Sequence, residues 1–279
     1  MKFTKMHGAG NDYVYINCFE ESVDDPKKLA LNMSNRNFGV GSDGLILIKP
    51  GEKAPFRMDM YNADGSWSEM CGNGLRCVAK YIYDKGMTKE ELFEIETGAG
   101  ILTVKIFPSN NKAEYIEINM GKPILEAKDI PMKGYNGRVI NEKLVIEDRT
   151  FNITGVSVGN PHCVIFLDED VKNFPVEKYG PLIENHTIFP NRVNVEFVQI
   201  ISPKEAIQRT WERGSGETLA CGTGATAVQI AGLLNEVLDK EVLIHLLGGD
   251  LYLRWDDSGD VYLKGPATLT FEGEWKLPL

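Results

Sequence analysis

The pattern of hydrophobic and polar positions in the first half of the chain predicts short strands. "YVYIN" (13–17) and "LILI" (45–48) are short apolar runs, and "RMDMYN" (57–62) alternates. A polar loop follows, and "GLRCVAKYIYDKG" (74–86) then places its apolar residues at helical spacing before a glycine stop. The predicted order in this half is strands, one helix and a hairpin.

The second half repeats this order. Its strand patterns are "HCVIF" (162–166), "VEFV" (195–198) and "AIQRTWER" (206–213), and its helix is "GATAVQIAGLLNEVLDK" (224–240). This helix is apolar on nearly all sides until its end, which predicts that it is buried and surrounded by strands.

The two halves also match in register, which predicts an internal duplication. A shift of 149 to 150 residues keeps the following pairs in order: Gly10-Asn11 with Gly159-Asn160, Gly44 with Asn194, Cys71-Gly72 with Cys221-Gly222, Gly74 with Gly224, and Gly98 with Gly248. We therefore expect two similar α/β domains, residues 1–120 and 121–265, with the C-terminal segment 266–279 completing the first. The Gly- and Pro-containing stretch 121–137 is the expected connector.

Composition and charge exclude several classes of protein. The 279 residues carry a formal charge of -10, which repels nucleic acid and anionic membrane surfaces. No stretch has the length and hydrophobicity of a signal peptide or a membrane span. The five cysteines are an odd number without a C-x-x-C pair, so we expect reduced thiols in a cytoplasmic protein rather than a disulfide framework or zinc site.

Two of these cysteines, Cys71 and Cys221, each open a C-G-x-G turn directly before a predicted buried helix. Unsatisfied N–H groups at a helix N-terminus favour negative charge, so we expect a lowered thiol pKa and a cradle for an anion at each turn. A thiolate and a thiol on opposite faces of one carbon can invert a stereocentre, because one removes a proton and the other delivers one. The doubled turn therefore indicates a two-thiol acid/base enzyme.

At these residues the chain resembles the diaminopimelate epimerase family. The similar blocks are "KMHGAGNDYV", "MDMYNADGSWSEMCGNGLRC", "GVSVGNPHCVIF", "NVEFV" and "WERGSGETLACGTGA", which cover essentially the whole chain. The resemblance implies interconversion of LL- and meso-2,6-diaminopimelate in lysine and peptidoglycan precursor biosynthesis, without pyridoxal phosphate or metal. It also implies a homodimer of chains with two pseudo-symmetric domains, each a curled, mostly antiparallel sheet around a central helix, and an active site in the cleft between the domains.

The resemblance also implies roles for individual residues. Cys71 and Cys221 correspond to the catalytic thiols, and His162 and Glu212 to residues that tune them. Arg213 suits the distal carboxylate and Glu212 an ammonium group of the substrate. The implied substrate contacts are Asn11, Asn62, Gly72, Asn73, Asn160, Asn194, Glu212, Arg213, Gly222 and Thr223. One position departs from the family: many members have Gln where this chain has Gly44, so that side-chain contact is missing.

Three other functions fit parts of the sequence. "GTGATA" matches a dinucleotide-binding fingerprint, although a long polar loop separates its glycines from the preceding strand. A dithiol redox protein explains the two cysteines but not Glu212 and Arg213. A noncatalytic binding protein of the same fold would bind diaminopimelate but exchange no α-hydrogen. The remaining cysteines, Cys18, Cys77 and Cys163, lie in apolar runs and are predicted to be core residues.

Overall fold

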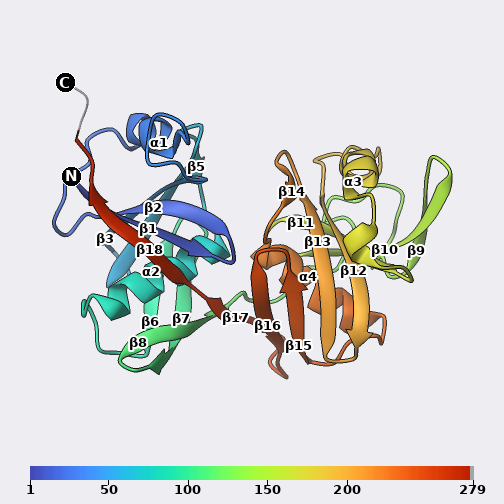
Figure 1. The fold of residues 1–279 in the computed structure, drawn as a ribbon. Coiled ribbons are helices and arrows are strands. Elements are labelled where there is room, and N and C mark those ends of the chain that lie inside the picture. Colours follow the sequence, from blue (N-terminus) through green and yellow to red (C-terminus); the bar gives the residue numbers. More distant parts are fainter. Residues whose placement is uncertain (277–279) are drawn as a thin grey trace. The chain divides into compact units, whose positions relative to one another are not determined.

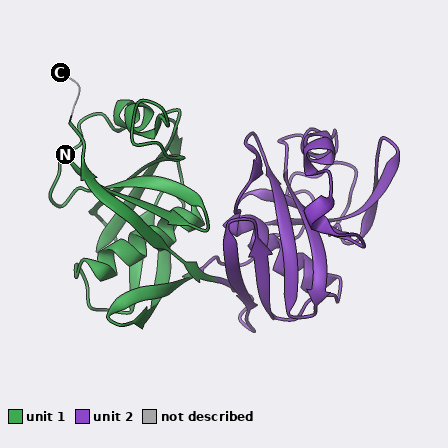
Figure 2. Cartoon of the chain, viewed as in Figure 1, with its two compact units in different colours: residues 1–118, 264–279 green, residues 119–263 purple. Residues whose placement is uncertain are grey.

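The computed structural model of the chain describes residues 1–276. Positions 277–279, the end of the segment expected to complete the first half, lie outside the described residues. The chain forms two units, Met1–Ile118 together with the segment from Lys264, and Asn119–Leu263 (Figure 2).

The first unit is a mixed sheet with two helices (Figure 1). Most of its strand pairs are antiparallel, but β2 and β3 run parallel with Tyr13 opposite Gly44. Strand β18 pairs with β1, so segments from both ends of the chain lie in this unit. Its elements are β1 (Lys2–Gly8), β2 (Asn11–Asn17), α1 (Pro26–Ser34), β3 (Gly44–Pro50), β4 (Phe56–Asn62), β5 (Trp67–Ser68), α2 (Gly72–Asp84), β6 (Leu92–Thr97), β7 (Gly100–Ser109), β8 (Lys112–Asn119) and β18 (Thr268–Glu274).

The second unit repeats this arrangement. Strands β11 and β12 run parallel, with His162 opposite Asn194, and so do β13 and β15. In the first unit the equivalent of the second of these pairs is β4 with β6. The elements of the second unit are β9 (Glu142–Ile146), β10 (Arg149–Ser157), β11 (Pro161–Leu167), the 3-10 helix η1 (Val171–Asn173), α3 (Val176–Glu184), β12 (Asn194–Ser202), β13 (Glu205–Glu212), β14 (Gly216–Thr218), α4 (Gly222–Leu234), β15 (Glu241–Leu246) and β16 (Gly249–Trp255). Strand β17 (Val261–Pro266) begins in the second unit and continues past Leu263 into the first.

The parallel pairs β2–β3 and β11–β12 are buried on both faces. In the second unit, Cys163 and Phe197 pack in one core with α3, whereas Val164 and Val198 pack in another with α4. In the first unit, Val14, Ile16, Leu45 and Leu47 form a core with α1. A strand buried on both sides consists of apolar residues throughout, which explains the unbroken runs "YVYI" and "LILI".

The structure corrects the expectation of one helix in each half. Helices α1 and α3, of nine residues each, were not expected. Helix α1 begins after Asp25, whose side chain accepts a hydrogen bond from the backbone N–H of Lys28 (3.0 Å), and has Pro26 at its first position. Segments this short carry too little periodicity to stand out in the sequence.

One other expectation is wrong in detail. Helix α4 ends at Leu234 rather than continuing to position 240, and the chain turns at Glu236, where φ is +59°. The stretch 121–137 lies within the second unit, where Ala127 and Ile130 are buried in the core with α3.

Candidate active site

Both cysteines of the C-G-x-G turns are the N-cap residues of equivalent helices, as expected. Helix α2 begins at Gly72 directly after Cys71, and α4 begins at Gly222 directly after Cys221. Cys221 also caps its helix chemically, because its Sγ accepts the backbone N–H of Gly224 at 3.4 Å. Each thiol is therefore held at the positive end of a helix.

In the first unit, Asn11 connects Cys71 to a carboxylate. The Cys71 thiol donates to Asn11 Oδ1 (3.3 Å), and the Asn11 amide donates to Asp43 (2.7 Å). Asp43 in turn accepts from Arg36 (2.8 Å). The carboxylate fixes the Asn11 amide so that its oxygen faces the thiol.

Asn73 and Arg76, both on α2, lie next to this group. Asn73 donates to Asn11 Oδ1 at 3.4 Å and accepts from Arg76 Nη2 at 2.9 Å. The Arg76 side chain is fully buried, and its Nη1 has no hydrogen-bond partner among residues 1–276. Burial lowers the pKa of Arg76, while the nearby thiols Cys77 and Cys71 act in the opposite direction. A buried cation thus lies close to the Cys71 thiol.

Asn62 and Gly44 take no part in the hydrogen bonds described above among Cys71, Asn11, Asn73 and Arg76. The Asn62 amide donates to Ser66 Oγ (2.9 Å) within the turn after β4. At Gly44 a Cβ atom would lie 2.2 Å from the Tyr61 carbonyl oxygen and 3.0 Å from the Tyr13 ring. Backbone and ring therefore occupy the space that a glutamine side chain would need in this backbone conformation.

In the second unit, a chain of hydrogen bonds connects Cys221 to a buried carboxylate. Cys221 Sγ contacts Thr223 Oγ1 (3.4 Å), which accepts from Asn160 Nδ2 (3.2 Å). Asn160 Oδ1 lies 3.0 Å from His162 Nε2, and His162 Nδ1 lies 2.7 Å from Glu196 Oε1. His162 and Glu196 are both completely buried. Four of these five residues were expected; Glu196 was not.

Three further expected residues lie around the end of β13. Glu212 Oε1 accepts the Thr218 hydroxyl at 2.6 Å. Asn194 accepts the backbone N–H of Arg213 (2.9 Å) and donates to the Pro161 carbonyl (2.9 Å), so its amide fixes the position of the backbone at Arg213. The Arg213 guanidinium donates to the Asn191 carbonyl (3.2 Å) and has no ion-pair partner within residues 1–276.

The expectation of a lowered thiol pKa is wrong for Cys221. Burial raises the pKa of Cys221 well above its usual value, and the charges of Glu212 and Glu196 add to this effect. The contacts with Thr223 and the Gly224 N–H oppose it but do not outweigh it. Burial also raises the pKa of Glu212. A helix N-terminus alone does not decide the charge of a thiol that is surrounded by carboxylates.

Sequence reasoning missed Glu196 and Arg76. The available signal was the same for both: a charged residue inside an apolar run, in "NVEFV" and in "GLRCVAKYI". Such a charge is rarely buried unless it has a partner or a task. Cys77 and Cys163 are fully buried and Cys18 is half-buried, in agreement with core positions.

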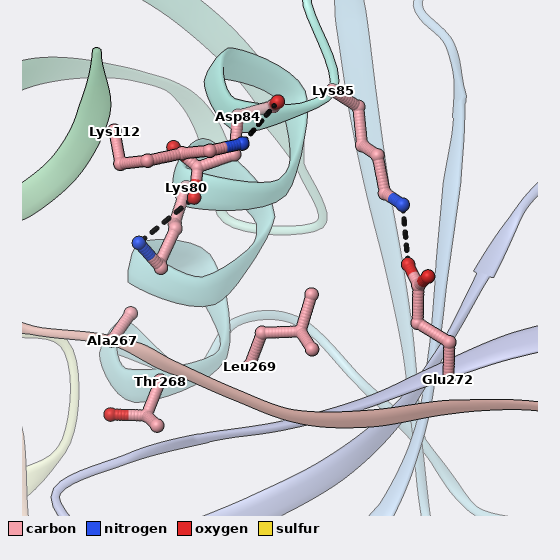
Figure 3. Close-up of a pocket in the computed structure, with 8 residues that line it drawn as sticks. All are labelled: Lys80, Asp84, Lys85, Lys112, Ala267, Thr268, Leu269 and Glu272. Carbon is pink, nitrogen blue, oxygen red and sulfur yellow. Dashed lines mark hydrogen bonds and ion pairs between the residues drawn. The ribbon is translucent and has the colours of Figure 1, made fainter. Parts of the chain in front are cut away.

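Outside the two cysteine sites, the described residues also form a hollow in which charged side chains are paired. This hollow in the first unit is lined by the end of α2 and by β18, and its charged groups pair with one another: Lys80 with Asp84 (2.9 Å), and Lys85 with Glu272 (Figure 3). Residues 1–276 contain no cluster of His, Cys, Asp and Glu suited to a metal ion. In the same range no helix is long and apolar enough to cross a membrane.

The fold places the chain in a class of two-unit α/β proteins. Solved structures with this fold include a PhzF-family phenazine biosynthesis protein from Bacillus anthracis, with a TM-score of 0.70 and 16% identity over 99% of both chains. A hydroxyproline epimerase from Agrobacterium vitis has a TM-score of 0.69 and 13% identity, covering 98% of this chain and 90% of that one. The fold class expected from the sequence is therefore confirmed.

Sequence comparison identifies the family. The family model for diaminopimelate epimerase matches residues 3–126 and 154–270. The diaminopimelate epimerase of Agathobacter rectalis is 52% identical, over 98% of this chain and 99% of that protein, and that of Acetivibrio thermocellus is 49% identical over 98% of each. The chain belongs to the diaminopimelate epimerase family.

Proposed function

We propose that the chain interconverts LL- and meso-2,6-diaminopimelate, as a step in the formation of lysine and of peptidoglycan precursors. Family membership over nearly the whole chain supports this activity. The observation that carries the mechanism is the placement of Cys71 and Cys221 as N-caps of equivalent helices in two similar units.

In this reaction one cysteine thiolate removes the α-hydrogen of the substrate. The C–H bond breaks, an S–H bond forms, and the electron pair is delocalised into the substrate carboxylate. The other cysteine then donates its thiol proton to the opposite face of the same carbon and becomes the thiolate. N–H groups at a helix N-terminus stabilise the enolate-like charge. In the reverse direction the two cysteines exchange roles.

The remaining expected residues are proposed to bind the two ends of the substrate. The raised pKa of Glu212 means that this carboxylate gains from a cationic neighbour, which agrees with a contact to a substrate ammonium group. Arg213, without a carboxylate partner among the described residues, is available to the distal carboxylate. The proposed binding set is Asn11, Asn62, Gly72, Asn73, Asn160, Asn194, Glu212, Arg213, Gly222 and Thr223.

The decisive experiment is incubation with LL-diaminopimelate in deuterated water, with isomer ratio and α-deuterium followed together. We expect deuterium in the newly formed meso isomer. Cys71→Ala and Cys221→Ala should each lose epimerisation by orders of magnitude, because one face then has no acid or base. Cys77→Ala is the matched control, since this thiol is buried in α2 and takes no part in the reaction. Binding of diaminopimelate without isomerisation or deuterium uptake would identify a noncatalytic binding protein instead.

We also propose a homodimer in the cytoplasm. Strand β18 supports an interface between copies, because Leu269 and Phe271 are 39% and 45% exposed on it. Light scattering coupled to size-exclusion chromatography tests this. A particle of 31.1 kDa would be a monomer and would contradict the proposal.

A further inference from the structure

Glu196 forms the buried end of the hydrogen-bond chain that leads to Cys221, here called the Glu196 relay: Glu196, His162, Asn160, Thr223 and Cys221. All five residues lie in the second unit. The successive distances are 2.7, 3.0, 3.2 and 3.4 Å. Glu196 makes none of these bonds to the thiol itself, so apart from its charge, which raises the Cys221 pKa, it acts on Cys221 through the relay.

We propose that Glu196 is a positioning residue: its carboxylate sets the direction of the relay so that the Thr223 hydroxyl donates to the Cys221 sulfur. The inference rests on the proposed function, in which Cys221 exchanges a proton with the substrate. It adds a residue for which the family resemblance implied no role.

The direction of the relay follows from the atoms that face one another. His162 Nδ1 faces a carboxylate oxygen and Nε2 faces the Asn160 side-chain oxygen, so each ring nitrogen lies opposite an acceptor. Asn160 therefore accepts with Oδ1 and donates with Nδ2 to Thr223. A hydroxyl has one proton and two acceptor lone pairs, so Thr223 can accept this bond and still donate its O–H to Cys221, 3.4 Å away, which is the direction that the relay requires.

The carboxylate of Glu196 is necessary for this arrangement. Its second oxygen, Oε2, is buried and has no hydrogen-bond partner within residues 1–276, so the contact of Oε1 with His162 is what holds this side chain. In Glu196→Gln, the neutral amide leaves His162 Nε2 free to accept a hydrogen bond. An Asn160 amide that turns over to donate to Nε2 directs its oxygen to Thr223 and takes the Thr223 proton away from Cys221.

The first unit shows that the fold itself does not need this ion pair. At the position equivalent to Gly224, a Cβ on Gly74 would lie 2.6 Å from Ile46 Cδ1, whereas a Cβ on Gly224 would lie 2.7 Å from Glu196 Oε1. Ile46 thus occupies in one unit the place of Glu196 in the other. Ile46 and Tyr13 are the first-unit equivalents of Glu196 and His162, and both are buried. Packing alone therefore does not explain a buried acid and base in the second unit.

Glu196→Gln tests the proposal, because it keeps the shape and removes the charge. We expect kcat to fall by about tenfold or more, as for a lost charge-assisted hydrogen bond, with little change in KM. Glu205→Gln is the matched control, since it breaks a Glu–His pair with His245 (2.9 Å) at the surface. Its kinetics should equal those of the unmodified protein.

A second readout does not need the substrate: the pH dependence of Cys221 alkylation by iodoacetamide, followed by mass spectrometry. The charged groups around the thiol are Glu196 on β12, Glu212 on β13 and His162 on β11. If Glu196 acted only by repulsion, its removal would lower the Cys221 pKa. If it directs the Thr223 hydroxyl, its removal should raise that pKa, because the sulfur then loses a hydrogen-bond donor.

Thr223→Val gives an independent test, because it removes the hydroxyl of this half-buried side chain with little change in shape. The variant should raise the Cys221 pKa, and adding Glu196→Gln should raise it no further. An unchanged or lowered pKa in either single variant overturns the proposal, as does an unchanged kcat in Glu196→Gln. Absence of α-deuterium uptake by the unmodified protein would refute the proposed function instead, while the alkylation measurement would still judge the relay.

Discussion

Gly224→Ala should destabilise the second unit although alanine favours helices. Gly224 lies in the first turn of α4, and a Cβ there would lie 2.7 Å from Glu196 Oε1, 3.0 Å from Gln208 Nε2 and 3.2 Å from Cys221 Cβ. To reach an ordinary contact of 3.4 Å, the carboxylate oxygen must move by about 0.7 Å. Glu196 is fully buried and held by His162, so this movement strains the pair.

Two opposing terms set the size of the effect. Replacing glycine by alanine in a helix gains about 1 kcal/mol or less. Overpacking a full interior costs about 1–3 kcal/mol. We therefore expect a net loss of about 1–2 kcal/mol in the free energy of unfolding. Gly72→Ala is the matched control at the start of α2, because no atom lies within 4 Å of the added Cβ. Its stability should be unchanged or increased.

Hydrogen exchange measured by mass spectrometry is the appropriate assay, because it reports each unit separately. In Gly224→Ala, the slowest amides of β12 and α4 should exchange about five- to thirtyfold faster, which corresponds to the expected loss. Peptides from β2 and β3 should be unchanged. If α4 exchanged no faster in Gly224→Ala than in the unmodified protein, the close contact between Gly224 and Glu196 would be refuted.

Three further outcomes are expected. Arg76→Met should slow alkylation of Cys71 at pH 8, because a buried cation is lost; an unchanged alkylation rate would contradict an effect of Arg76 on this thiol. The free energy of unfolding should change by less than about 2 kcal/mol, because removal of the buried charge offsets the lost hydrogen bonds. Burial raises the pKa of Cys77 from 9.0 to about 11, so the thiol's contribution to stability is complete below pH 9.0 and is lost toward pH 11. Between these pH values, the free energy of unfolding of Cys77→Ala should fall less steeply than that of the unmodified protein, by about 1.4 kcal/mol per pH unit. Parallel curves for the two proteins would contradict the raised pKa. Arg213→Ala should lower kcat/KM for diaminopimelate by the equivalent of about 2 kcal/mol and should reduce the preference of the enzyme for diaminopimelate over lysine. If the ratio of kcat/KM for the two compounds were the same in both proteins, Arg213 would not be the residue that binds the distal carboxylate.

The sequence predicted the elements whose pattern is local. The strands and the two cysteine-capped helices follow from alternation, helical spacing and glycine turns. The end of α4 did not follow, because Leu238 continues the apolar spacing although it lies beyond a turn. In the structure Leu238 packs against Gly232, where a Cβ would lie 2.4 Å from its side chain. Contacts of this kind depend on the tertiary fold rather than on the periodicity of the chain.

The candidate site was predictable to a similar degree. Cys71 and Cys221 stood out because their turns occur twice. Glu196 did not, because its meaning depends on the parallel pairing of β11 with β12, which brings it to His162. The pKa of Cys221 was also beyond sequence reasoning, since it depends on how burial and two carboxylates balance against a helix end. The repeated sequence pattern indicated the two cysteines. Their electrostatic surroundings depend on burial and on strand pairing in the folded chain.

The pairing of β1 with β18 has a consequence for the order in which the units fold during synthesis. The ribosome makes β1 first and β18 last, so the first unit to begin is the last to be completed. The second unit is contained in one continuous segment and can fold as soon as Leu263 has left the ribosome. Until β18 arrives, the outer edge of β1 keeps unpaired backbone groups, which are open to strand pairing with other chains. A nascent chain that stalls beyond Leu263 would therefore carry a finished second unit and an aggregation-prone first one.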